Sequence, residues 1–372
     1  MGYLSIFCVL VFMAGCSSFD KLSFEKGKSH SQNLRVLWAH NFDPEYETGN
    51  LPISYNSPLV AGETIFLGNQ QGEMYSFELS SGRVLWKSLD KKIFVGKPTV
   101  FENKIFYGTQ EGRLIARNRY TGELFYEVDL GYAMDSTPVY SEGKLVVQLQ
   151  NHALVVLEAN SGKILWNYKG SFVERTTLRR WNHPLVAQGK VFFGTPEGEF
   201  IALALEDGRG LWTQKISRQD KFPDVSMTAV YHNMAIYVGA SDEELKKIDP
   251  KTGQVLRSFP FVATRPILPM GRDFLVSTQE GKIIQSDDYG HVVKEFSMPE
   301  SNIVALGPSF QDDGVIVASS DGHIYLVNWS DLAIEGKFPL GHRYSFIYGE
   351  MSALNNYLAF YSSRNRLYVM RK

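Results

Sequence analysis

A repeating unit of about 40 residues runs through most of this chain and limits what it can fold into. Three consecutive copies align without gaps and span Ser57–Ser88, Lys97–Val128 and Thr137–Tyr168. Each copy opens at a proline and carries a glycine in its last turn, and both markers recur 40 residues apart. The markers are Pro58, Pro98 and Pro138, with Gly82, Gly122 and Gly162. Self-similarity at this period predicts an array of similar small structural units.

Each unit contains four short runs of alternating apolar and polar residues, rich in β-branched and aromatic types and separated by turn residues. Four strands in a unit of this length are typical of one blade of a β-propeller. Further copies begin at His183-Pro184, Met227, Arg265-Pro266 and Gly307-Pro308, and the copy that begins at Met227 is degenerate.

The two ends of the repeat region complement each other. The segment from Arg35 to Trp38 resembles the last strand of a unit, with no preceding three, whereas Ser352–Met370 resembles three strands with no fourth. Joined, they make an eighth unit and close a ring, which removes exposed sheet edges. The sequence therefore predicts an all-β, eight-bladed propeller of four-stranded antiparallel blades over residues 34–372, with the last blade closed by the N-terminal strand.

Tryptophan recurs in the last strand of several units, at Trp38, Trp86, Trp166 and Trp212. We expect these rings to pack between neighbouring blades, because large aromatic side chains at a fixed place in a repeat fill the contact with the next copy. The alternative is a row of rings that stack on a ligand.

The N-terminus has the features of an export signal. An apolar run, Tyr3–Ala14, is too short to cross a bilayer comfortably and is followed by Gly15 and Cys16. Small residues before a cysteine resemble the bacterial lipobox, although Met13 stands where leucine is preferred and the first residues lack Lys and Arg. The resemblance implies a signal peptide over residues 1–15, acylation of Cys16 and a flexible tether over 16–33. The alternative is a hydrophobic terminus that is retained, or cleaved without lipidation.

The residue after the cysteine bears on the membrane to which a lipoprotein is sorted. Ser17 stands there, where an aspartate would be the signal for retention at the inner membrane. By resemblance to sorted lipoproteins, the chain is expected at the cell outer membrane, lipid-anchored and facing the periplasm.

Composition argues against several classes of function. The net charge of −2 gives no basic surface for nucleic acid. Both cysteines lie within the first sixteen residues, so the repeat region has neither a disulfide nor a cysteine metal site. The histidines are scattered without metal-ligand spacing, and no nucleophile elbow is present. Asp287-Asp288 and Asp312-Asp313 are expected in turns, with a Ca²⁺ site as the alternative. We therefore predict no catalytic residue, no metal and no cofactor.

The pattern x-Leu-x-x-x-Ser/Thr-Gly-x-x-x-Trp resembles the repeat of pyrroloquinoline-quinone-type propellers over nearly the whole region after the tether. Quinoprotein dehydrogenases with this repeat hold their quinone through Ca²⁺, and many place a vicinal disulfide against it. The absence of cysteine from the repeats disfavours that activity here. A quinone-dependent dehydrogenase that uses the central funnel stays as a rival hypothesis.

A closer resemblance is to the BamB family of outer-membrane assembly lipoproteins. Besides the lipobox and the split last unit, two local segments, Thr176–Arg180 and Phe222–Ser226, precede the fourth and fifth units, as in that family. Leu178, Arg179 and Asp224 match the family's residues. The positions that depart are Thr176, Arg180 and Ser226.

That resemblance implies a non-catalytic scaffold that docks through Leu178, Arg179 and Asp224 onto a periplasmic domain of the barrel-inserting subunit. Unfolded outer-membrane proteins are a further implied partner. An alternative role for Arg179 is an ion pair with Asp224 that ties two blade connections together. An alternative function is an independent cell-envelope propeller that binds peptide or glycan.

Overall fold

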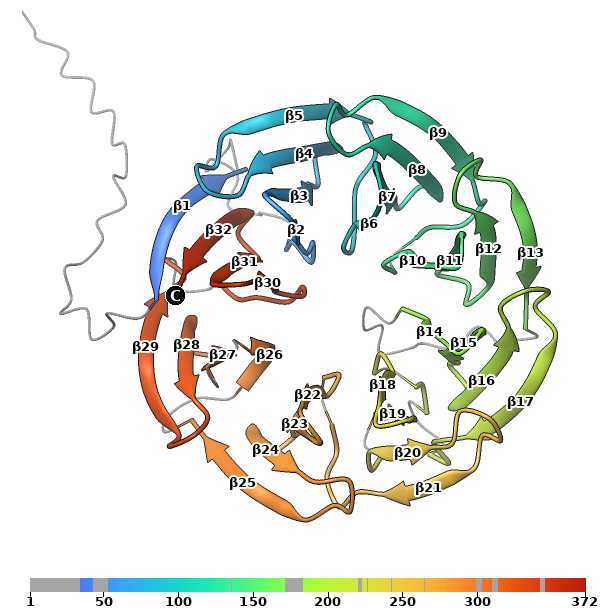
Figure 1. Ribbon diagram of the computed structural model, residues 1–372, viewed down its shortest axis with the longest axis vertical. Coiled ribbons are helices and arrows are strands. Elements are labelled where there is room, and N and C mark those ends of the chain that lie inside the picture. Colours follow the sequence, from blue (N-terminus) through green and yellow to red (C-terminus); the bar gives the residue numbers. More distant parts are fainter. Residues whose placement is uncertain are drawn as a thin grey trace, which may run out of the picture.

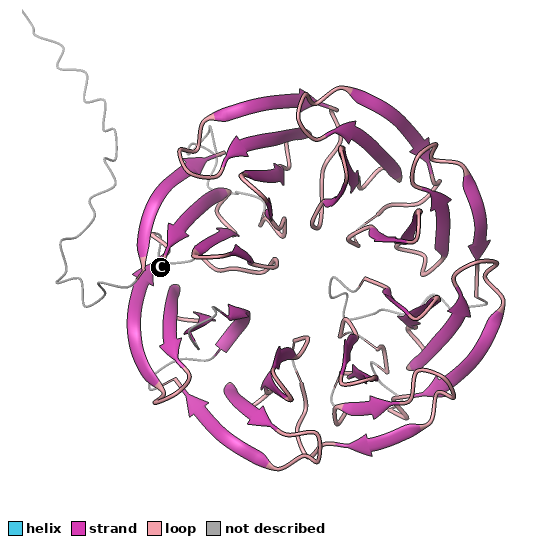
Figure 2. Ribbon diagram, in the orientation of Figure 1, coloured by secondary structure: helices cyan, strands magenta, loops and turns pink. Residues whose placement is uncertain are grey.

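The computed structural model describes residues 34–42, 53–134, 136–170, 183–219, 223–225, 227–241, 243–263, 265–298, 303–309, 314–341 and 345–372. All regular structure in these residues is β-strand, with no helix (Figure 2). None of the described segments has the helical length and hydropathy needed to span a bilayer.

The strands form eight four-stranded antiparallel sheets arranged as a ring about a central axis (Figure 1). In chain order we call these sheets blades 1 to 8, and in each the strands run from the axis to the rim. Blades 1 to 4 comprise β2 (Leu59–Ala61), β3 (Thr64–Gly68), β4 (Glu73–Glu78), β5 (Val84–Leu89); β6 (Thr99–Phe101), β7 (Lys104–Gly108), β8 (Arg113–Asn118), β9 (Leu124–Asp129); β10 (Val139–Ser141), β11 (Lys144–Gln148), β12 (Leu154–Glu158), β13 (Ile164–Tyr168); and β14 (Leu185–Ala187), β15 (Lys190–Gly194), β16 (Glu199–Ala204), β17 (Gly210–Lys215). Blades 5 to 8 comprise β18 (Val230–His232), β19 (Ala235–Val238), β20 (Lys246–Ile248), β21 (Val255–Ser258); β22 (Leu268–Met270), β23 (Asp273–Ser277), β24 (Lys282–Ser286), β25 (Val292–Ser297); β26 (Ile303–Ser309), β27 (Gly314–Ser319), β28 (His323–Asn328), β29 (Ala333–Pro339); and β30 (Ser352–Leu354), β31 (Tyr357–Tyr361), β32 (Arg366–Arg371) with β1 (Arg35–Asn41). The predicted fold class is confirmed.

Blade 8 is assembled from the two ends of the chain. Strand β1 pairs antiparallel with β32 and brings Ala39 opposite Tyr368 (Figure 1). On the inner side, the Val60 amide of blade 1 donates to Ser352 Oγ of blade 8 at 3.0 Å. The predicted closure by the N-terminal strand is confirmed, and the ring has no open first or last blade.

Burial falls from the middle of each blade to its rim. In blade 1, Ile65, Phe66 and Leu67 of β3 are fully buried, whereas β5 alternates between exposed and less exposed residues. The buried clusters join neighbouring blades, since Phe106 of β7 packs in one cluster with Leu145 of β11. Each fully buried Leu, Ile or Phe contributes about 1.5–3 kcal/mol relative to an exposed one, so contacts between blades stabilise the ring substantially.

The recurrent tryptophans pack between blades, as predicted. Trp86 of β5 lies against Gly122 in the last turn of blade 2, where an added Cβ would stand 2.8 Å from the ring, and its Nε1 donates to Arg119 O at 2.9 Å. The same arrangement joins Trp38 to Gly82, Trp166 to Gly208 and Trp212 to Gly253. In blade 2, Tyr126 takes the place of the tryptophan and lies against Gly162. Glycine is therefore required in these turns for two reasons: the backbone has a positive φ, and the aromatic ring of the preceding blade leaves no room for a Cβ.

Two blades depart from the common pattern. The degenerate fifth copy has short second and third strands, Ala235–Val238 and Lys246–Ile248. In blade 7, β26 shifts register twice against β27. Both still pair as four-stranded sheets, because their neighbours supply the apolar surface that buries them.

Candidate functional site

The connection between β17 and β18 contains Asp224, one of the residues expected to bind a partner. The described part of this connection packs between blades 4 and 5. The amide of Val225 donates to Thr195 O at 3.2 Å, and Ser241 donates its amide to Asp224 O at 3.4 Å. Asp224 is only 6% exposed. In this conformation little of its carboxylate is accessible to a partner, so its part in docking stays a prediction.

The other expected site residues lie outside the described residues. These are Cys16, Thr176, Leu178, Arg179, Arg180 and Ser226. The ends of the two blade connections nevertheless meet, because the His183 amide before β14 donates to Thr228 Oγ1 before β18 at 3.4 Å. The segments 171–182 and 216–229 therefore lead into neighbouring inner strands on the same face of the disc.

The sequence predicts a mildly basic zone near these connections, formed by Lys215, Arg218, Lys221, Arg179 and Arg180, of which the last three lie outside the described residues. Lys215 Nζ donates to the backbone carbonyl of Glu197, and the Arg218 amide donates to the Glu243 carboxylate at 3.3 Å. The Glu243 carboxylate therefore lies beside the backbone of Arg218, and the described part of this surface includes an acidic side chain.

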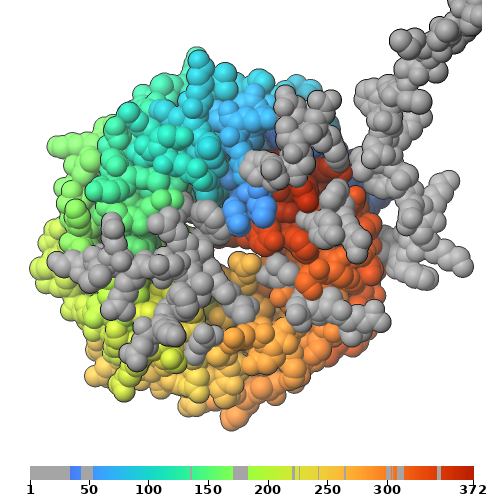
Figure 3. All heavy atoms as spheres, turned by 180° about the vertical axis from the view of Figure 1, so that it is seen from behind, coloured from blue at the N-terminus to red at the C-terminus, as the bar shows by residue number. Residues whose placement is uncertain are grey.

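A central channel runs along the propeller axis and has a cavity volume of about 560 Å³. All eight blades line it, and in seven of them the residue two positions before the inner strand contributes. These residues are Ser57, Lys97, Thr137, His183, Thr228, Pro266 and Glu350. Figure 3 shows a narrow opening at the centre of one face. The sequence analysis did not identify this set, although five of its members stand before, or at, the opening proline of a repeat.

Glu350 of blade 8 is the centre of an ion cluster inside the channel. Its Oε2 lies 3.2 Å from Lys97 Nζ of blade 2, and its Oε1 lies 3.7 Å from His183 Nδ1 of blade 4. Its amide donates to Ser57 Oγ at 2.8 Å. Blades 4 and 8 are opposite in a ring of eight, so the contact with His183 crosses the axis. The channel is narrow enough here for side chains of opposite blades to meet.

The surroundings change the pKa of both partners. Burial raises the pKa of the Glu350 carboxyl, but the charges of Lys97, His183 and Arg265 outweigh burial and hold it below its ordinary value. Burial lowers the pKa of His183, against the opposing influence of Glu350. The Glu350 side chain is 46% accessible and lines the channel. Glu350 is therefore ionised and His183 is largely neutral at pH 7.

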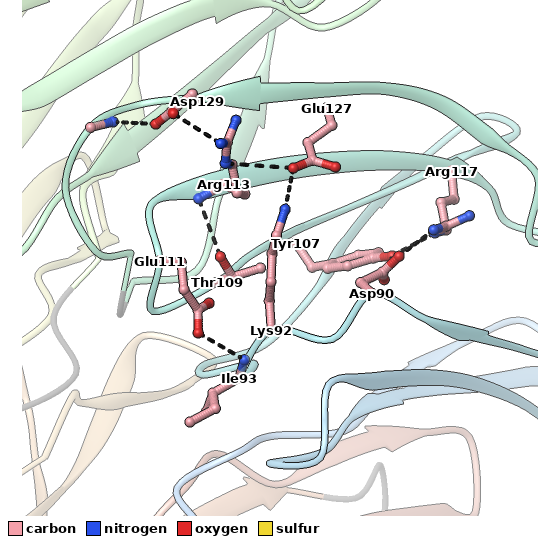
Figure 4. A network of polar contacts seen from close by, with 11 residues as sticks. Asp90, Lys92, Ile93, Tyr107, Thr109, Glu111, Arg113, Arg117, Glu127 and Asp129 are labelled. Atoms are coloured by element: carbon pink, nitrogen blue, oxygen red, sulfur yellow. Dashed lines mark hydrogen bonds and ion pairs between the residues drawn. The ribbon is translucent and has the colours of Figure 1, made fainter.

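A second polar cluster lies between blades 1 and 2 (Figure 4). Asp90, after β5, forms an ion pair with Arg117 of β8, and the Tyr107 hydroxyl donates to Asp90 at 2.9 Å. Burial and the charge of Asp90 raise the pKa of Tyr107. Beside them, Glu127 pairs with Lys92 and with Arg113. Each of these charges has a partner of opposite sign, so the cluster ties the β5–β6 connection to blade 2 and offers no reactive group.

The described residues contain no group of three or more His, Cys, Asp or Glu side chains placed to hold a metal ion. The Asp287 carboxylate accepts from the amides of Tyr289 and His291, each at 2.8 Å, and Asp288 pairs with Lys247 at 3.1 Å. The expected turn role of Asp287-Asp288 is confirmed, whereas Asp312-Asp313 lies outside the described residues.

The family model and the curated relatives that match this chain carry the same description. The family model described as "Outer membrane protein assembly factor BamB" matches residues 80–285, just over half of the chain. Among curated proteins, an outer membrane protein assembly factor BamB of Yersinia pestis is 23% identical over 297 residues, which cover 75% of each chain. Its counterpart in Bordetella pertussis is 23% identical over 356 residues, covering 89% of this chain and 87% of the relative.

Solved structures agree on the fold. BamB from Moraxella catarrhalis superposes with a TM-score of 0.76 at 17% identity and covers 91% of this chain and all of its own. A europium-containing methanol dehydrogenase reaches a TM-score of 0.74 at 14% identity, covering 91% of this chain and 93% of its own, so the fold alone does not separate the two activities. The family model matches more than half of the chain, and the chain therefore belongs to the outer membrane protein assembly factor BamB family.

Proposed function

We propose that this chain is a non-catalytic scaffold lipoprotein of the machinery that assembles β-barrel proteins in the outer membrane. The observation that carries the proposal is the family match over the repeats of a closed eight-bladed ring. A closed ring with buried ion pairs is a rigid body, which suits the presentation of loops to a partner. Cys16 would be acylated after removal of residues 1–15, and residues 16–33 would tether the propeller on the periplasmic side.

The docking surface would be formed by the connections that lead into blades 4 and 5. Leu178 supplies an apolar anchor, and Arg179 supplies a planar group with several donors for a carboxylate or carbonyl. The close approach of His183 and Thr228 supports a common surface, since it joins the ends of both connections. Asp224, being buried, would act by fixing the second connection or by pairing with Arg179. The partner would be a periplasmic domain of the barrel-inserting subunit, with unfolded barrel precursors as further clients.

Copurification tests the proposal. The full-length protein is isolated from solubilised membranes, and its partners are identified by mass spectrometry. Arg179→Glu is compared with Arg209→Glu, a control on blade 4 whose side chain is 72% exposed and lies in the β16–β17 turn. We expect Arg179→Glu to weaken recovery of the barrel-inserting subunit about tenfold, and the control to have no effect, because rim charges on the opposite face make no contact. Failure of the wild-type protein to recover any barrel-assembly subunit would defeat the proposal.

The same experiment separates the rival functions. An independent envelope propeller that binds peptide or glycan would recover neither the barrel-inserting subunit nor barrel precursors, and Arg179→Glu would not change what it recovers. A quinone-dependent dehydrogenase would show a higher melting temperature with quinone and Ca²⁺, which the scaffold proposal does not expect.

A further inference from the structure

The turn between the second and third strands has the same sequence pattern, Thr-x-Glu-Gly, in blades 2, 4 and 6. It spans residues 109–112, 195–198 and 278–281, and its glycine has a φ of +80°, +80° and +78° in turn. In all three the glycine amide donates to the threonine carbonyl, at 3.1, 3.2 and 3.1 Å. Glu111, Glu197 and Glu280 therefore occupy equivalent positions, and their surroundings can be compared directly.

The glutamates of blades 2 and 6 are stabilised in the ordinary way. Glu111 is exposed to solvent, and its carboxylate accepts from the amide of Ile93 at 3.4 Å. Glu280 is also exposed to solvent. Water, or water and a backbone amide, thus solvates each of these charges.

Glu197 of blade 4 differs from both. Almost no surface of either carboxylate oxygen is accessible to solvent, and neither oxygen has a hydrogen-bond partner among the described residues. Lys215 Nζ lies close by, but it donates to the backbone carbonyl of Glu197. A carboxylate that has neither water nor a partner is unfavourable, and a cation brought to it would remove this cost.

The turn that carries Glu197 packs against the connection between β17 and β18, which we propose for docking. The Ile216 amide at one end of this connection donates to Gly198 O at 2.8 Å, and a Cβ added to Gly198 would stand 2.7 Å from Pro223 O. The Glu197 side chain as a whole is partly exposed, so its carboxylate lies just beneath the surface. Because the carboxylate makes no hydrogen bond here, an outward rotation of the side chain breaks none.

We propose that Glu197 is a docking residue, whose carboxylate turns outward and pairs with a basic side chain, arginine or lysine, of the protein that docks at this connection. The inference rests on the proposed function and adds the chemistry of the partner group to it. Arg179 and Glu197 would then present a cation and an anion from the same face. Such a pair of opposite charges restricts docking to a partner surface that carries both signs in the matching order.

Calorimetric titration of the purified full-length protein with the barrel-inserting subunit tests the inference. We expect Glu197→Gln to weaken binding at least about tenfold, since a hydrogen bond to a charged group carries that much affinity. Glu280→Gln is the matched control, because it makes the same change in the equivalent turn of blade 6 and should leave binding unchanged. Added salt should weaken binding of the wild-type protein more steeply than that of Glu197→Gln.

The melting temperature separates docking from support of the fold. Glu197→Gln removes a charge that has no partner in the free protein, so its melting temperature should equal or exceed that of the wild type. A lower melting temperature that accompanies the loss of binding would overturn the inference, since the carboxylate would then stabilise the propeller itself. Equal binding by Glu197→Gln and the wild type would also overturn it and leave the proposed function standing. A wild-type protein that does not bind the subunit would defeat both.

Discussion

Replacement of Gly122 by alanine tests the idea that aromatic rings hold neighbouring blades together. Gly122 has a φ of +77°, and a Cβ there would stand 2.8 Å from two carbon atoms of the Trp86 ring. Gly143 is the matched control, since its φ is +76° and an added Cβ meets nothing within 4 Å. Both substitutions force alanine into the left-handed region, which costs about 1–2 kcal/mol. Only the first also displaces a buried ring.

The difference between the two variants measures the contact between blades. Overpacking typically costs about 1–3 kcal/mol, so Gly122→Ala should lower the free energy of unfolding by about 2–5 kcal/mol and Gly143→Ala by about 1–2 kcal/mol. Urea denaturation of the purified protein, followed by tryptophan fluorescence, gives both values. Equal losses in the two variants would contradict the reasoning.

A second substitution identifies the ring as the cause. In a Trp86→Ala background the space beside the turn is empty, so Gly122→Ala should cost only the backbone contribution of about 1–2 kcal/mol. If the larger cost persists without the ring, the strain at Gly122 has another origin. The hydrogen bond from Trp86 Nε1 to Arg119 O is lost in both members of that comparison and cancels.

Three further outcomes are expected. Asp90→Ala leaves Arg117, whose side chain is 14% exposed, without its partner carboxylate and should lower the free energy of unfolding by about 3–5 kcal/mol. Leucine at both positions should restore most of the loss. A loss below about 1 kcal/mol for the single change, measured by urea denaturation, would refute this. The pKa values of His183 and Glu350 are lowered in the fold, so the unfolded chain binds protons first and stability present at pH 7 is lost as pH falls, below about 6.5 for His183 and below about 4.5 for Glu350. Melting temperatures from pH 7 to about 2.5 should show both losses. Glu350→Gln should reduce the lower one, to which Asp288 and Asp321 also contribute, and an unchanged loss in this variant would contradict the reasoning. Deletion of residues 34–41 removes β1 and exposes the edge of β32. Light scattering should then detect self-association of the protein, which an added peptide of the same residues should suppress. A monomer with an unchanged melting temperature would contradict the role of β1 in closing the ring.

The repeat determined the architecture because it states the same local pattern many times. The 40-residue spacing of Pro58, Pro98 and Pro138 fixed the blade size, and the unmatched segments at the two ends fixed the eighth blade. Even the degenerate copy from Met227 could be placed, since its neighbours set the register on both sides. Packing of Trp86 between blades was also predictable, because tryptophan recurs at the same place in the unit, whereas the glycine of the next blade on which it lies came from the structure.

The expected docking residues were identified from the resemblance to a family, whereas the burial of their side chains could be known only from the structure. Asp224 matches the family pattern, yet whether its carboxylate faces solvent depends on how Val225 and Thr195 join blades 4 and 5. No local pattern in the sequence reports such contacts. The basic residues Lys215 and Arg218 are likewise visible in the sequence, whereas the Glu243 carboxylate beside the Arg218 amide became apparent only from the fold.

By itself, the sequence determined a closed ring of eight four-stranded sheets, since periodicity and turn chemistry are local properties that repeat. Only the tertiary structure decided that Lys97, His183 and Glu350 meet at the axis. Up to 253 residues separate them along the chain, and ring closure alone brings opposite blades within reach. Electrostatic coupling depends on distance in space, which a repeat does not encode until the circle is complete.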